Sequence, residues 1–238
     1  MSRIVGILGG MGPLATADLY RKIILATPAA RDQDHLHVVI DADPSVPDRT
    51  AALRGEAPDP TPWLLRGARR LEAAGVAFIV VPCNTAHAFL PAVRPHVAIP
   101  ILDMIAETAA RVHADFPAAR RVGVLATRGT VESGLYHRAL AAEGLEAITP
   151  DAAAQDRLVG AAIAAVKAGD TSAAVGMLVV EAGRGLVAAG AEVLLAACTE
   201  LPLVLTAANS PAPLLDPTQA LAEAAVREAL AAPVAGAR

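Results

Sequence analysis

Residues 76–85 read VAFIVVPCNT, and residues 191–200 read AEVLLAACTE. Each stretch begins with an apolar run typical of a buried strand and ends with a cysteine, Cys83 or Cys198, followed by polar residues. The two cysteines are 115 residues apart. Ligand sites of parallel α/β sheets lie at the carboxyl ends of the strands. The two stretches therefore predict two equivalent strand ends, each with one thiol.

Two further pairs of stretches repeat in the same order. Residues 4–12 read IVGILGGMG, and 118 residues later residues 122–130 read VGVLATRGT. Residues 100–103 read PILD, and 113 residues later residues 213–216 read PLLD. Three pairs at nearly one spacing indicate that the chain consists of two homologous halves.

Strand-like and helix-like segments alternate along both halves. Stretches with helical spacing, such as 62–74 and 155–168, separate most of the short apolar runs. This alternation predicts an α/β fold with two pseudo-symmetric halves, each a parallel sheet flanked by helices, and a ligand site in the cleft between them. We expect one half over 1–105, joined by a C-terminal helix over 217–232, and the other over 106–216. The expected strands are 3–8, 37–40, 76–81, 99–102, 121–125, 192–196 and 212–215.

Composition limits the classes of function. The chain has 238 residues, of which 54% are hydrophobic and 18% charged, as is typical of a globular protein. The net charge is −4, there is no basic run, and only 3% of residues are aromatic, so we expect no nucleic-acid partner. No stretch approaches the roughly 20 apolar residues of a membrane span, and the first residues do not resemble a signal peptide. We expect a cytoplasmic protein with a small-molecule partner and no membrane association.

The two cysteines allow three interpretations. A position between a strand and a helix N-terminus is expected to lower both thiol pKa values toward neutrality. If the halves pack about a pseudo-twofold axis, the thiols approach one cleft from opposite sides. That arrangement suits removal of a proton from one face of a carbon atom and its return to the other. The alternatives are two buried, inert cysteines and a redox pair, for which the chain lacks the CxxC spacing.

The glycine-rich stretch has a separate interpretation. Residues 10–15 read GMGPLA and fit the G-x-G-x-x-A fingerprint of dinucleotide-binding folds. Asp41, the first acidic candidate at a strand end, follows Gly12 by 29 residues rather than about 20. A nucleotide site would also leave both cysteines unexplained, so this interpretation is the weaker one.

Short blocks spread over nearly the whole chain match a known family. They are 9–13 (GGMGP), 47–50 (PDRT), 82–87 (PCNTAH), 125–127 (LAT) with 129–130 (GT), and 198–200 (CTE). On these blocks the chain resembles the aspartate/glutamate racemase superfamily, most closely its aspartate racemase branch. Glutamate racemases carry an Asp-Ser-Gly motif near the start of the chain and a histidine after the second Cys-Thr. This chain has Gly9 to Gly12 and Glu200 at those positions. It departs from the family pattern at Ala197 and Arg128. The resemblance implies a homodimer, with the active site in the cleft between the halves and Cys83 and Cys198 as the catalytic pair.

Further residues are expected to bind the substrate. Arg49 lies in the proline-rich stretch 44–62, which we expect to form a loop over an opening. The resemblance assigns Arg49 to a substrate carboxylate, which a guanidinium binds through two charge-assisted hydrogen bonds. It assigns Lys167, one of only two lysines, to a second carboxylate. The remaining candidates are Met11 of the glycine-rich block and the polar groups Asn84, Thr85, Thr127, Thr130, Thr199 and Glu200 at strand ends.

Each of these residues also has a purely structural interpretation. Arg49 would be a solvated loop residue, Lys167 a favourable charge at a helix C-terminus, and the threonines helix N-caps. His87, four residues after Cys83, is expected to be a structural histidine outside the catalytic set.

These observations predict a cofactor-independent amino-acid racemase, an isomerase that acts on aspartate or a similar acidic amino acid through the two thiols. We expect no metal and no pyridoxal phosphate, since only Lys22 and Lys167 could form the Schiff base that this cofactor requires. The alternatives are another carbanion enzyme of the superfamily, such as a decarboxylase or isomerase of small dicarboxylic acids, and a non-catalytic amino-acid-binding module.

Overall fold

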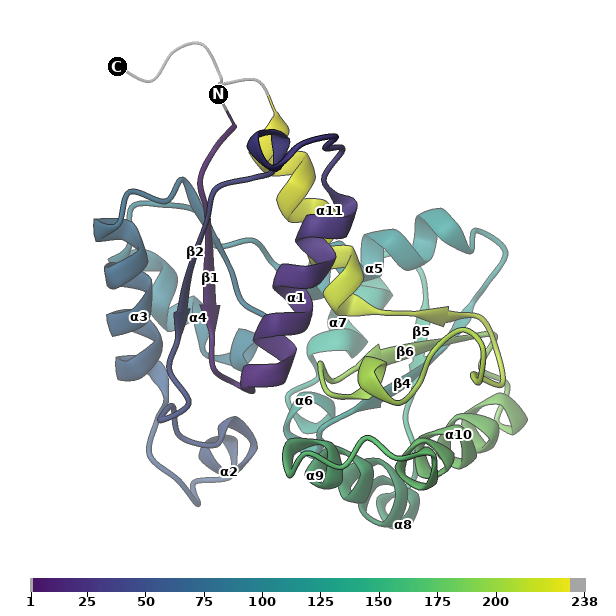
Figure 1. Ribbon diagram of the computed structural model, residues 1–238. Coiled ribbons are helices and arrows are strands. Elements are labelled where there is room, and N and C mark those ends of the chain that lie inside the picture. The colour runs from purple at the N-terminus through teal and green to yellow at the C-terminus, as the bar shows by residue number, and fades with distance from the viewer. Residues whose placement is uncertain (1, 232–238) are drawn as a thin grey trace.

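The computed structural model describes residues 2–231 and contains two parallel sheets, each flanked by helices (Figure 1). In the first sheet β1 (Val5–Gly9) lies between β2 (Val38–Ala42) and β3 (Phe78–Val80). The second sheet has the order β5-β4-β6-β7. Its strands are β4 (Arg121–Ala126), β5 (Glu146–Ile148), β6 (Val193–Ala197) and β7 (Leu214–Leu215). The predicted fold class is confirmed.

The strand pairing shows the internal repeat and corrects its alignment. Ile79 bridges Ile101 in the first half, and Leu194 pairs with Leu214 at the equivalent place in the second. Ile79 also pairs with Gly6, whereas Leu194 pairs with Gly123. Gly6 and Gly123 are 117 residues apart, so the spacing of 118 for the first block is wrong by one residue. A one-residue slip would turn every side chain of the strand to the other face, and the apolar sequences alone did not reveal it.

Helices follow most strands and cover both sheets (Figure 1). A π-helix over Gln155–Gly160 connects α8 to α9, and 3-10 helices cover Asp32–Asp34 (η1), Thr85–Ala88 (η2), Arg94–His96 (η3) and Leu201–Leu203 (η5). The α-helices are α1 (Pro13–Ala26), α2 (Arg49–Leu53), α3 (Thr61–Ala73), α4 (Leu90–Val93), α5 (Met104–Asp115), α6 (Arg128–Glu132), α7 (Leu135–Ala142), α8 (Ala152–Ala154), α9 (Ala161–Lys167), α10 (Ala173–Ala188) and α11 (Pro217–Leu230).

The two aspartates of the repeated PILD and PLLD blocks are helix N-caps. The Asp103 side chain accepts hydrogen bonds from the backbone N–H groups of Ile105 and Ala106 and so begins α5. Asp216 accepts one from the N–H of Thr218 and begins α11. A carboxylate at this position satisfies free backbone donors of the first turn. In both halves this block therefore ends a strand or bridge and begins a helix capped by its aspartate.

The C-terminal helix returns to the first half. Leu221 and Ala225 of α11 pack into one core cluster with Val5 and Ile7 of β1, and α11 contacts both α1 and α5. The helix was predicted over 217–232 and ends at Leu230, while residue 232 lies outside the described residues. The exact division of the chain into halves stays a prediction.

A buried ion cluster ties α1 to the beginning of α11. The Lys22 ammonium contacts both Asp18, one turn earlier in α1, and Asp216. Lys22 is 7% exposed, so these two carboxylates replace water as its partners. Lys22 is therefore a structural lysine. Within residues 2–231 no helix is long and apolar enough to cross a membrane.

Two local expectations were wrong, and one strand was missed. Residues 99–102 form only the bridge at Ile101 rather than a full strand, and β5 was not expected. The proline-rich stretch 44–62 contains the short helix α2. The helix expected over 155–168 is present, but it begins as a π-helix, where the Gln155 side chain donates a hydrogen bond to the carbonyl of Ala126 at the end of β4. Such long-range contacts decide local structure that sequence spacing leaves open.

Candidate active site

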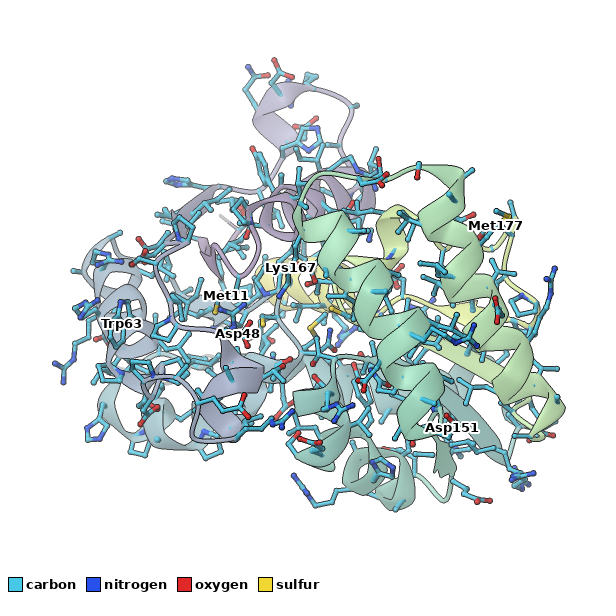
Figure 2. The ribbon with its side chains drawn as sticks, turned by 90° about the horizontal axis from the view of Figure 1, so that it is seen from below. Met11, Asp48, Trp63, Asp151, Lys167 and Met177 are labelled. Atoms are coloured by element: carbon cyan, nitrogen blue, oxygen red, sulfur yellow. The ribbon has the colours of Figure 1, made fainter. Side chains whose placement is uncertain are left out.

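A polar pocket lies where residues of both halves meet. In Figure 1 the carboxyl ends of β1 and β2 point toward α2, and α2 faces α6 and α9 of the second half. Figure 2 shows Met11, Asp48 and Lys167 close together near the middle of the molecule. The pocket has an empty volume of about 290 Å³, including the space at its mouth. Its lining residues are Met11, Asp48, Arg49, Thr50, Cys83, Asn84, Thr85, Thr127, Lys167, Cys198, Thr199 and Glu200.

One cysteine of each half reaches this pocket. Cys83 follows β3 and Cys198 directly follows β6, and each is 6% exposed. Both sulfurs are free thiols. The segments after them are the short 3-10 helices η2 and η5 rather than full α-helices. Each half therefore supplies one nearly buried thiol at an equivalent strand end.

The Cys198 thiol pairs with a carboxylate. Its Sγ–H donates a hydrogen bond to Oε2 of Glu200, with a sulfur–oxygen distance of 3.0 Å. Burial and the negative charge of Glu200 raise the pKa of the Cys198 thiol well above its usual value. The prediction of a lowered pKa is wrong for this cysteine, because a single 3-10 turn offers little dipole to oppose the buried carboxylate. Cys198 consequently rests as a protonated thiol.

His87 is fixed in a structural role. Its Nδ1 lies 2.9 Å from the carbonyl oxygen of Cys83, and its Nε2 accepts a hydrogen bond from the backbone N–H of Met104. These partners require the neutral tautomer with the proton on Nδ1. Burial lowers the pKa of His87 and favours the same neutral form. The ring positions the backbone of Cys83, while its own nitrogens are both occupied.

Arg49 begins α2 and is almost fully buried. Its Nη1 donates to the carbonyls of Val46 and Pro47, and its Nη2 donates to the carbonyl of Met11 at 3.4 Å. Its Nε is buried without a partner among the described residues. A guanidinium has five N–H donors. The Nε–H and one Nη2–H make no hydrogen bond to the described residues.

Lys167 ends α9 and faces the first half. Its Nζ lies 3.9 Å from Oδ2 of Asp48, the N-cap of α2. Burial opposes ionisation of Asp48, but the Ala51 N–H and the charges of Lys167 and Arg49 hold the pKa of Asp48 below its usual value. The pocket is thus lined by two cationic side chains, Arg49 and Lys167, and the carboxylate of Asp48 lies between α2 and α9.

Three predicted hydroxyl groups meet at the boundary between the halves. The Thr85 hydroxyl lies 2.8 Å from those of Thr127 and Thr130, which are 3.0 Å apart. Thr85 and Thr127 line the pocket, whereas Thr130 is 1% exposed and lies outside the lining. The structure therefore places Thr130 behind the two other threonines, where it supports them.

Close backbone approaches shape the walls. A Cβ at Gly12 would lie 3.2 Å from Oε1 of Glu200, and a Cβ at Gly129 would lie 2.8 Å from Oγ1 of Thr50. Glycine at these positions lets the glycine-rich stretch and α6 reach the opposite half. The carboxylate of Glu200 beside Gly12 would repel a pyrophosphate, so the site does not favour the dinucleotide interpretation.

Sequence reasoning missed two lining residues. Asp48 and Thr50 flank Arg49 in the same PDRT block, and that adjacency was the available signal. A second hollow adjoins the pocket, has about 750 Å³ of empty volume including open solvent, and shares Met11, Arg49, Lys167 and Glu200 with it. The side chains of Arg49 and Lys167 therefore lie where the two hollows adjoin. Within residues 2–231 no group of three or more acidic, histidine or cysteine side chains could hold a metal ion.

Two parallel sheets related by an internal repeat, with one cysteine of each half in a shared polar pocket, define the class of pseudo-symmetric α/β racemases. The chain belongs to the Asp/Glu/Hydantoin racemase family, whose model matches residues 8–225. It is an isomerase, an amino-acid racemase of the Asp/Glu racemase superfamily.

Similar proteins align with nearly the whole chain. The broad specificity amino-acid racemase RacX of Bacillus subtilis is 32% identical over 238 residues, which cover 96% of this chain and 99% of RacX. Picrophilus torridus aspartate racemase has 32% identity and a TM-score of 0.84, with 95% of this chain and 94% of that chain covered. Glutamate racemase from Francisella tularensis, solved with D-glutamate, shares the fold at 19% identity and a TM-score of 0.71, with 94% and 79% covered.

Proposed function

We propose that the protein racemises aspartate or a similar acidic amino acid by proton transfer at Cα between Cys83 and Cys198. One observation carries this proposal: thiols from equivalent positions of the two halves line one pocket together with Arg49 and Lys167. The relatives named an aspartate racemase and a broad specificity racemase agree with an amino-acid substrate.

The mechanism needs one thiolate and one thiol in each direction. In one direction the Cys83 thiolate takes the proton from Cα and becomes a thiol, and the electron pair of the broken C–H bond delocalises into the α-carboxylate. The Cys198 thiol then gives its proton to the opposite face of Cα and becomes a thiolate. The reverse reaction exchanges these roles. The raised pKa of Cys198 suits it to begin as the acid.

The pocket offers separate groups for the substrate's two carboxylates. The free Nε–H and Nη2–H of Arg49 and the ammonium of Lys167 suit a side-chain carboxylate. Asn84, Thr85, Thr127 and Thr199 suit the α-carboxylate and the negative charge that develops on it. Met11 contributes an apolar contact to the wall. In this proposal Glu200 orients the Cys198 thiol.

The proposed reaction uses no pyridoxal phosphate. Lys22 is held between two carboxylates in a buried cluster away from the pocket, where it cannot reach the substrate. Lys167 has Asp48 beside it and serves the substrate. Protein freed of metal and of pyridoxal phosphate should keep full activity, and activity that returns only with added cofactor would refute this part of the proposal. Homodimer formation and a cytoplasmic location stay predictions.

The test is chiral chromatography of single-enantiomer amino acids after incubation with the purified protein. L-aspartate and D-aspartate should each approach a 1:1 mixture, faster than neutral amino acids of similar size. Loss of total amino acid with release of CO₂ would indicate the alternative decarboxylase. Retention of optical purity for every amino acid, despite measurable binding, would indicate a binding module.

A further inference from the structure

Tyr136, which is not among the predicted site residues, contacts a residue that lines the pocket. Tyr136 of α7 is 1% exposed and packs in the core of the second half with residues such as Val124 of β4 and Leu195 of β6. Its phenol O–H donates a hydrogen bond to Oδ1 of Asn84, with an oxygen–oxygen distance of 2.6 Å. Asn84 belongs to the first half and lines the pocket. The hydrogen bond therefore joins the two halves at the candidate active site.

The direction of this hydrogen bond is fixed by chemistry. Burial raises the pKa of Tyr136, so the phenol remains a protonated donor throughout the range in which proteins are active. A side-chain amide has one accepting oxygen and one donating NH₂ group. With Oδ1 of Asn84 held by Tyr136, the group left for other partners is Nδ2.

That remaining group lacks a partner. Asn84 is 2% exposed, and its Nδ2 is buried with no hydrogen bond to any of the described residues. A buried donor without an acceptor is costly, and native structures rarely keep one without a functional reason. Because Asn84 lines a pocket that suits carboxylates, an oxygen of a bound carboxylate is the natural acceptor.

We propose that Tyr136 is a positioning residue: it holds the amide oxygen of Asn84 so that Nδ2 donates to a carboxylate oxygen of the substrate. The inference rests on the proposed function, because it assigns the donor to a carboxylate-bearing substrate. It also means that the second half orients a binding group of the first.

A double-mutant cycle with Tyr136→Phe and Asn84→Ala tests the inference. Tyr136→Phe keeps the buried ring and removes only the O–H, and it should lower kcat/KM for aspartate about 2- to 12-fold, the usual effect of one neutral hydrogen bond. Asn84→Ala should lower it at least as much. Once Asn84 is alanine, Tyr136→Phe should add almost no further loss. Equal losses in both backgrounds, or no loss in Tyr136→Phe, would overturn the inference.

The chain supplies a matched control. Tyr20 is its other tyrosine, lies on α1 and is 39% exposed. Tyr20→Phe should leave kcat/KM unchanged. Wild-type protein that racemises no amino acid would contradict the proposed function, whereas an active wild type with additive losses would contradict only the role of Tyr136.

A spectroscopic measurement covers the case in which Tyr136→Phe folds poorly. In the Tyr20→Phe variant, 3-fluorotyrosine labels position 136 alone. Saturating aspartate should shift its ¹⁹F resonance, because binding at Nδ2 changes the charge on the amide oxygen that accepts the phenol proton. Asn84→Ala should abolish the shift. A resonance that saturating substrate leaves unmoved in active enzyme would contradict the inference.

Discussion

The thiol of Cys198 donates a hydrogen bond to Oε2 of Glu200 at 3.0 Å. In the internal repeat, the residue of the first half that is equivalent to Glu200 is Thr85. Two residues after each equivalent cysteine the side chains therefore differ: a carboxylate follows Cys198 and a hydroxyl follows Cys83. Environments that separate the pKa values of two groups assign one as acid and the other as base. In the proposed reaction Glu200 raises the pKa of the Cys198 thiol and so favours this thiol as the acid.

Glu200→Gln should change the pH profile of racemisation. The active form has one thiol and one thiolate, so kcat/KM rises with pH as the first thiol ionises and falls as the second ionises. Cys198, with its raised pKa, sets the falling limb. Glutamine removes the negative charge that helps to raise this pKa, so the falling limb should move to lower pH.

The control is Glu181→Gln, an exposed glutamate of α10, which should leave both limbs in place. The measurement is kcat/KM for aspartate across the pH range for wild type and both variants. A falling limb that Glu200→Gln leaves unchanged would mean that Cys198 is not the group that titrates there.

Arg49→Ala should weaken catalysis on acidic amino acids more than on neutral ones. It removes a charge-assisted partner of the carboxylate worth roughly 1.5–3 kcal/mol, or about 10- to 150-fold in kcat/KM. Arg54→Ala, five residues later and exposed, is the matched control and should have little effect. Equal losses on acidic and neutral amino acids would show that Arg49 acts only by holding the backbone of its own segment.

Lys167→Met should show the same selectivity as Arg49→Ala. Among residues 2–231, the only ionic contact of its ammonium is the one to Asp48 at 3.9 Å, so its removal disturbs little of the surrounding structure. Steady-state kinetics with aspartate and with a neutral amino acid of similar size measure the selectivity. If the variant loses activity only on the neutral substrate, the assignment to acidic substrates is wrong.

Lys22→Met should destabilise the fold. It leaves the carboxylate of Asp18, whose side chain is 6% exposed, and that of Asp216 without their shared cation. Removing one partner of a buried ion pair typically costs about 3–5 kcal/mol. Arg21→Met is the control, because Arg21 pairs with the same Asp18 but is 61% exposed, and its loss should cost at most about 1 kcal/mol. Urea unfolding measures both, and equal losses would contradict the role given to the buried cluster.

The repeated strand ends made both the α/β fold and the cysteine pair predictable, because parallel strands bring their carboxyl ends to one edge. The sequence could not fix the register of β1 and β4, since apolar strands match equally well one residue apart. The raised pKa of Cys198 depends on the orientation of the Glu200 side chain, and the contact of Tyr136 with Asn84 joins residues 52 positions apart. Both are tertiary contacts between side chains, for which spacing along the chain carries no signal.

Single replacement of each cysteine by serine tests the two-thiol mechanism most directly. Hydroxyls are far too weakly acidic to replace a thiol in proton transfer, and general acid–base groups typically contribute 10²- to 10⁴-fold. Racemisation of aspartate should fall by at least about 10²-fold in both Cys83→Ser and Cys198→Ser, with melting curves checking that the variants fold.

The decisive readout is exchange of the Cα proton in heavy water, followed by NMR for each pure enantiomer of aspartate. A variant with one thiol left should exchange deuterium into only the enantiomer that faces this thiol and return it to the same face. Cys83→Ser and Cys198→Ser should therefore show opposite enantiomer preferences. Near-wild-type racemisation in either variant, or the same enantiomer preference in both, would contradict the assignment of one thiol to each face of Cα.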